Sequence, residues 1–112
     1  MATPQTKFRT FAEFWPYYLG AHAKRGTRIL HHIGLALAAL SLLGAIVFWN
    51  WYLLVVALFF SYGPAWIGHA LIEHNRPATF DYPWWSAIGD IRMGLMALTG
   101  RLDGELKRLG IN

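Results

Sequence analysis

Histidines at the two ends of a long apolar segment are the residues of this sequence that point most directly to chemistry. The 44 residues between Arg28 and Glu73 include no Asp, Glu, Lys or Arg, and His31 and His69 lie near the ends of that segment. Asn50 lies 19 residues after His31 and 19 residues before His69. A helix rises about 1.5 Å per residue, so a chain that reverses at Asn50 returns both imidazoles to the same level. Ionisable groups at such a position are candidates for function.

A polar stripe follows the second half of this segment and includes His69. Tyr62, Trp66, His69, Glu73 and Arg76 recur at spacings of four, three, four and three residues, which places them on one face of a helix. His69 and Glu73 could therefore bind one metal ion, or Glu73 could orient the imidazole. The alternatives are an ion pair between Glu73 and Arg76 or a capped helix end. We take Tyr62, Trp66 and Arg76 as candidates for substrate binding.

Other side chains could complete or support such a site. His22 precedes the apolar segment and could supply a further nitrogen. His32 and His74 are rotated by about 100° and about 140° from the inward-facing histidines of the two arms. Asp90 and Arg92 could support the site or form the solvated face of a later helix. The chain has no cysteine, and several histidines with at most one carboxylate suit iron, zinc, copper or nickel better than magnesium or calcium.

The apolar segment is long enough for two membrane spans. One span needs about 20 apolar residues to cross roughly 30 Å of hydrocarbon. We expect spans over about 28–48 and 51–72, joined by a turn at 49–51, where Asn50 tolerates a left-handed conformation and the neighbouring aromatic residues suit the headgroup layer. Pro64 should interrupt and bend the second span.

Amphipathic helices are expected on both sides of the hairpin. Apolar residues recur mostly every three or four positions over 8–19 and again over 84–98, a pattern typical of helices that lie in the membrane interface. A single membrane domain would comprise 8–102, with a polar leader at 1–7 and a charged tail at 103–112. The predicted fold class is all-α: an integral membrane, two-span helical hairpin flanked by N- and C-terminal amphipathic interfacial helices.

Basic residues flank the expected hairpin on both sides. The chain carries a net charge of +4, and 55% of its residues are hydrophobic, whereas 14% are charged. Five basic residues precede the hairpin, five follow it, and none lies in the turn. The positive-inside rule therefore predicts that both termini are cytoplasmic. Because membrane topology explains the charge, we expect no nucleic-acid partner.

Several motifs of the chain are similar to those of one known protein family. They are RILHHIG at 28–34, SYGPAWIGH at 61–69, EHNRPATF at 73–80, YPWWS at 82–86 and GDIRM at 89–93. Through them the chain resembles a small membrane-protein family, long catalogued as a domain of unknown function, that includes the fungal 2-hydroxy-fatty-acid dioxygenase of phytosphingosine breakdown. The resemblance covers about residues 8–102.

The resemblance implies an iron(II)-dependent oxygenase that uses dioxygen to shorten a 2-hydroxy fatty acid by one carbon, a reaction called alpha-oxidation. The family's histidines fall on His22 in LGAH, His31 in R-x-x-H-x-x-G and His69 in W-x-G-H. These three residues would then be the iron ligands, and with Glu73 from the polar stripe they are the expected catalytic residues. The implied partners are a membrane lipid or 2-hydroxy fatty acid, and dioxygen.

Two other interpretations fit the residues. Gly34, Ala38, Ser41 and Ala45 form a stripe of small residues suited to close helix contact. A non-catalytic membrane protein that binds lipid or a partner helix would therefore also explain the hairpin. Haem held between the two histidines of the hairpin is a more distant alternative. A two-span hairpin also exposes much of its perimeter to lipid, which leaves room for a homo-oligomer.

Overall fold

The computed structural model describes residues 8–111, in which the regular structure is helical. No strand occurs within this range, so the all-α prediction is confirmed for this part of the chain. The predicted polar leader at 1–7 lies outside the described residues. The elements are α1 (Phe11–Gly20), α2 (Arg25–Val47), α3 (Tyr52–Gly68), the π-helical turn η1 (His69–Glu73), the 3₁₀ turn η2 (Ala78–Phe80), α4 (Pro83–Leu98) and α5 (Leu102–Arg108).

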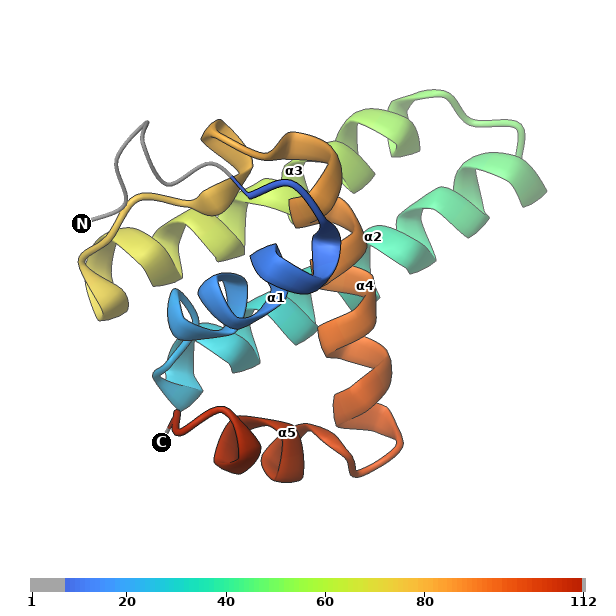
Figure 1. Ribbon diagram of the computed structural model, residues 1–112. Helices are drawn as coiled ribbons and strands as arrows, with labels where there is room; N and C mark the ends of the chain where they lie inside the picture. Colours follow the sequence, from blue (N-terminus) through green and yellow to red (C-terminus); the bar gives the residue numbers. More distant parts are fainter. Residues whose placement is uncertain (1–7, 112) are drawn as a thin grey trace.

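The helices α2 and α3 form an antiparallel hairpin that projects from the rest of the molecule (Figure 1). Arg25–Val47, and Tyr52–Glu73 formed by α3 with η1, are both long and apolar enough to cross a membrane. Only 22% and 17% of their most apolar stretches are buried inside the protein, so most of the apolar hairpin surface is exposed. The two predicted spans are therefore present as two helices of the required length.

Gly34 brings α2 and α3 into close contact. A Cβ atom at Gly34 would lie 2.6 Å from the backbone oxygen of Phe60 and 3.2 Å from the Pro64 side chain. Proline has no N–H to offer the carbonyl four residues earlier, so the Phe60 carbonyl lacks its usual helical partner. Nevertheless α3 continues through Pro64 to Gly68, and the predicted interruption does not occur. Proline is tolerated here because the neighbouring helix packs against the freed carbonyl.

The turn of the hairpin lies where the sequence predicts it, although a different residue takes the left-handed conformation. Trp49 has a φ of 53°, whereas Asn50 was expected to hold that position. The N–H of Asn50 donates to the Ala45 carbonyl at 3.1 Å, which is the 6→1 bond of a Schellman motif and requires the preceding residue to be left-handed. The Asn50 side chain instead accepts a hydrogen bond from the Tyr52 N–H at 3.1 Å and so caps the start of α3.

The main buried core lies at the open end of the hairpin, where α1, α4 and α5 pack together (Figure 1). One face of α1 is buried there, which identifies its apolar stripe as a surface that packs on protein. The predicted charged tail also contributes, because its residues 103–108 form most of α5, which buries Leu102 and Leu106. The buried members of this core are Phe14, Trp15, Tyr18, Leu19, Ala78, Met93, Met96, Leu102 and Leu106.

The two faces of α4 have different surroundings. The face predicted from the apolar pattern is exposed and includes Ile88, Ile91 and Leu95, each 52–53% exposed. The buried face is made of smaller and more flexible residues, Ser86, Gly89, Met93 and Met96. A large apolar side chain is therefore a poor guide to the protein core in this helix, because lipid as well as protein can cover it.

Candidate metal centre

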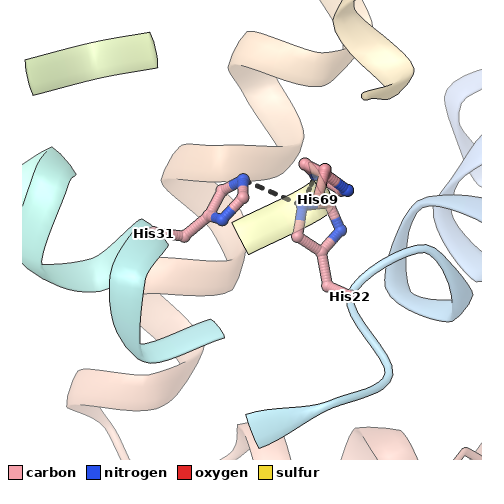
Figure 2. A group of neighbouring side chains, drawn as sticks. All are labelled: His22, His31 and His69. Carbon is pink, nitrogen blue, oxygen red and sulfur yellow. Dashed lines mark hydrogen bonds between the residues drawn. The ribbon is translucent and has the colours of Figure 1, made fainter. Parts of the chain in front are cut away.

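Three histidines from separate segments meet where the hairpin contacts the loop after α1, and Figure 2 shows their rings gathered together. His22 follows α1, His31 lies on α2, and His69 is the first residue of η1. The Nε2 atom of His22 lies 2.9 Å from that of His31 and 3.1 Å from that of His69. His22 and His69 are 1% and 2% exposed, and the side chain of His31 is 8% exposed. The hairpin and the loop after α1 therefore build one buried group of nitrogens.

The other ring nitrogen of each histidine faces a hydrogen-bond acceptor. Carbonyl oxygens accept and do not donate, so each Nδ1 must carry the hydrogen. The side-chain amide of Asn75 also turns its oxygen toward a histidine ring, because its Nδ2 atom donates to the Ala21 backbone oxygen at 3.0 Å. The acceptors are the Tyr18 oxygen, 2.7 Å from His22 Nδ1, the Thr27 oxygen, 3.1 Å from His31 Nδ1, and Asn75 Oδ1, 2.6 Å from His69 Nδ1.

These tautomers leave an unprotonated Nε2 on each of the three rings, and this arrangement fits a metal ion. Lone pairs about 3 Å apart repel one another unless a proton or a cation lies between them, and here the hydrogens are on the Nδ1 atoms. Two nitrogens bound to one ion at about 2.1 Å lie about 3.0–3.4 Å apart for bond angles of about 90–110°. The observed separations of 2.9 and 3.1 Å are close to that range. Three neutral imidazoles without a thiolate suit iron, zinc, copper or nickel.

The loop that carries His22 is held by an arginine. Arg28 is 9% exposed, and its Nη1 atom donates to the backbone oxygens of His22 at 2.9 Å and Ala23 at 2.7 Å. Burial, together with the neighbouring His31, lowers the pKa of His22 well below its usual range. The ring of His22 is therefore neutral at physiological pH, the state in which imidazole binds a metal.

A local change of helix type brings His69 and its partner Asn75 together. The helix of α3 widens into the π-helical turn η1 and then stops at His74, which is left-handed with a φ of 58°. This reversal directs the Asn75 N–H to the His69 carbonyl at 2.9 Å and the Asn75 side chain to the His69 ring. Sequence periodicity does not identify Asn75, because six residues along a regular helix correspond to a rotation of about 240° from His69.

Glu73 makes a different contact from the one that its four-residue spacing from His69 predicted. Its Oε2 atom accepts a hydrogen bond from the Lys24 backbone N–H at 2.5 Å, at the start of α2. The acceptor that orients His69 is Asn75, and Glu73 is not one of the three residues whose ligand atoms converge. Glu73 therefore links the end of η1 to the loop that carries His22.

A hydrogen-bonded pair, Tyr18 and Asp90, lies beside the histidines. The Tyr18 hydroxyl donates to Asp90 Oδ1, which is 3.9 Å from His31 Nε2. Gly89 permits this approach, since a Cβ atom there would lie 3.0 Å from the Tyr18 ring. Burial raises the pKa of Asp90 to about 6. Arg92 lies away from the site, with its guanidinium carbon 4.5 Å from the centre of the Trp15 ring.

Two adjoining cavities open beside the histidines. The smaller, of about 20 Å³, has room for one small polar molecule or group. The larger, of about 210 Å³, extends between α2, α3 and α4. The two share His31, Ser61, Tyr62, Thr79 and Asp90 in their walls.

The candidates for substrate binding divide between these cavities and the surface. Tyr62 and Trp66 line the smaller cavity, and their ring centres lie 5.5 Å apart. Arg76 lines neither cavity: its guanidinium carbon lies 4.8 Å from the centre of the Phe80 ring, and its Nε atom lies 3.4 Å from Asp81 Oδ2. The structure thus brings two of the three candidates to the histidines.

Comparison with known proteins agrees with the motifs and the histidine geometry. Residues 8–102 match the model of a family described as 2-hydroxy-palmitic acid dioxygenase Mpo1-like. No curated protein and no solved structure gives a match. The family match includes all three converging histidines, both candidate spans and α4. The chain therefore belongs to the Mpo1-like family.

Proposed function

We propose that this protein is an iron(II)-dependent membrane dioxygenase that acts on 2-hydroxy fatty acids and shortens them by one carbon. The observation that carries the proposal is the convergence of the Nε2 atoms of His22, His31 and His69. The family description names a 2-hydroxy-palmitic acid dioxygenase, which supplies the substrate class. When bound, ferrous iron would supply a site for oxygen ligands and the electrons with which dioxygen reacts.

The chain's own residues would orient the substrate and exclude water. The three imidazoles are neutral, and their Nδ1 hydrogen bonds hold the Nε2 atoms in position to bind a metal. The site therefore does not have to reorganise to bind iron. Tyr62 and Trp66 close the smaller cavity with aromatic surface. Leu35 and Ile91 line the larger cavity and provide apolar surface for the acyl chain.

The membrane placement follows from the hairpin. We propose that Arg25–Val47 and Tyr52–Glu73 cross the bilayer and that the turn at Trp49 reaches the far interface. The metal centre would then lie near the interface on the side of the termini, where a fatty acid places its polar head. The basic residues on both flanks of the hairpin support a cytoplasmic location for both termini.

The alternatives are less well supported by the geometry. Gly34, Ala38 and Ala45 are buried, and Gly34 contacts α3, so these small residues do not form a free surface for a partner helix. Haem between His31 and His69 would require its macrocycle to pass between their Nε2 atoms. The Nε2 atom of His22 lies there, 2.9 and 3.1 Å from the other two.

Iron content and turnover test the proposal. Protein purified without oxygen in mild detergent and loaded with iron(II) should bind close to one iron per chain. His31→Ala and His69→Ala should lose this iron, whereas His74→Asn should retain it, because His74 is exposed and outside the converging group and asparagine also tolerates its left-handed conformation. With dioxygen, the wild type should convert 2-hydroxypalmitic acid to a product one carbon shorter. Well-folded wild-type protein that binds no iron, or iron-loaded protein without this product, would refute the assignment.

A further inference from the structure

Ser86 is a buried hydroxyl group without a hydrogen-bond partner. It is 4% exposed, and within residues 8–111 its Oγ atom has no donor or acceptor in contact. The helical hydroxyls of Ser41 and Ser61 donate to the backbone oxygen four residues earlier, at 2.8 and 2.9 Å. Ser86 makes no such bond, although burial of an unpaired hydroxyl costs stability. The Thr27 hydroxyl is also unpaired, but it lines neither cavity beside the histidines. A bound ligand could therefore supply the hydrogen-bond partner that Ser86 lacks.

Ser86 lies in the wall of the smaller cavity, on the same face of α4 as Asp90. The two residues are four positions apart, a spacing at which the Cβ atoms of a helix lie about 5–6 Å apart. Both line the cavity that the three histidines also line. A ligand group at the metal centre would therefore meet the Ser86 hydroxyl and the Asp90 carboxylate together.

The chemistry of this pair favours a hydroxyl group over a carboxylate. Asp90 Oδ1 accepts a hydrogen bond from the Tyr18 hydroxyl, so the second carboxylate oxygen is available as a further acceptor. A serine hydroxyl can donate one hydrogen. A ligand hydroxyl matches both, since it can donate to Asp90 and accept from Ser86, whereas a ligand carboxylate has no hydrogen to donate to Asp90.

We propose that Ser86 and Asp90 bind the 2-hydroxyl group of the fatty acid and so determine the preference for 2-hydroxy acids over unsubstituted acids. The inference rests on the proposed function for its substrate class and adds the residues that recognise the substituent. The carboxyl end of the ligand then lies toward the histidines. The acyl chain leaves through the larger cavity between α2, α3 and α4, which shares Asp90 and His31 with the smaller one.

Equilibrium binding under nitrogen tests this recognition without turnover. Radiolabelled 2-hydroxypalmitic acid and palmitic acid are titrated separately into iron-loaded protein in lipid nanodiscs. We expect the wild type to prefer the 2-hydroxy acid. Ser86→Ala should reduce that preference by about five- to tenfold, the effect of one lost hydrogen bond, with palmitic acid affinity and iron content unchanged. Ser41→Ala removes a hydroxyl already bonded to Leu37 outside both cavities and should match the wild type.

A second variant tests the acceptor. Asp90→Asn keeps an oxygen for the Tyr18 hydroxyl but loses the charge, and it should also lower the preference for the 2-hydroxy acid. An unchanged preference in Ser86→Ala, or an equal loss of affinity for both acids, would overturn the inference, as would a wild type without any preference. If the wild type shows the preference, Ser86→Ala loses it, and dioxygen yields no product, recognition stands and the proposed dioxygenase activity fails.

Discussion

Asn75 offers a direct test of how the metal centre is held together. Its Oδ1 atom accepts a hydrogen bond from His69 Nδ1 at 2.6 Å, and its Nδ2 atom donates to the Ala21 carbonyl at 3.0 Å, one residue before His22. One side chain therefore fixes the tautomer of one ligand and the loop that carries another. Asn75→Ala removes both bonds and leaves all three imidazoles in place.

The expected loss of metal affinity in Asn75→Ala follows from these two hydrogen bonds. Each contributes roughly 0.5–1.5 kcal/mol, and the one to Ala21 is exposed and belongs at the lower end of that range. A combined loss of about 1–2 kcal/mol corresponds to about a 5- to 30-fold weaker metal affinity, which overlaps the roughly 10- to 100-fold effect typical of residues that orient metal-binding histidines. Asn75→Asp should lose less, because its carboxylate still accepts from His69 but cannot donate to Ala21.

Iron(II) affinity is measured without oxygen by competition with a chromophoric chelator. Asn50→Ala is the matched control, since its side chain also bonds to backbone but lies in the hairpin turn. Helix content by circular dichroism should be the same in all variants. Wild-type affinity in Asn75→Ala would refute the inference that this asparagine orients His69, and equal losses in Asn50→Ala would show that the effect is not local.

Two further predictions concern the fold around the site. Gly34→Ala places a Cβ atom 2.6 Å from the Phe60 oxygen and should lower the free energy of unfolding by about 1–3 kcal/mol, measured by denaturant titration in detergent. Gly20→Ala, which meets no atom within 4 Å, should cost much less, and an equal loss in both would contradict the packing argument. The pKa of Glu105 is lowered from 4.5 to about 2, chiefly by the hydrogen bond from Arg108. Its stabilising contribution should therefore be complete above about pH 4.5 and be lost as the pH falls toward about 2, seen as faster hydrogen exchange in α5. Glu105→Gln should lack this pH dependence, and a wild-type exchange rate that is constant over this range would contradict the role of the ionised group.

The sequence by itself determined the hairpin and the relation between two of its histidines. A bilayer demands long apolar helices, so the uninterrupted segment between Arg28 and Glu73 could be divided into two spans without knowledge of any tertiary contact. The fixed rise of a helix then placed His31 and His69 at one level, on equal arms about Asn50. His22 could be proposed as a ligand from its nearness to the hairpin and from a family motif, but not positioned.

Only the tertiary structure decided how the site is completed. His22 reaches the other two rings because Arg28 holds its loop. The spacing of Glu73 made it a candidate either to bind the metal or to orient His69, yet Asn75 orients His69 because η1 widens and His74 turns left-handed. Helical periodicity assumes regular dihedral angles and cannot foresee such a change.

The same limit applies to the helices around the hairpin. The apolar face of α4 that the sequence pattern identified is exposed, while Ser86 and Gly89 face the protein. An apolar residue can be covered by lipid or by protein, and the residue type alone does not indicate which of the two covers it. The packing of α1 and α5 against α4 determines which face of α4 the protein covers. It also places the Ser86 hydroxyl in the wall of the cavity beside the three histidines.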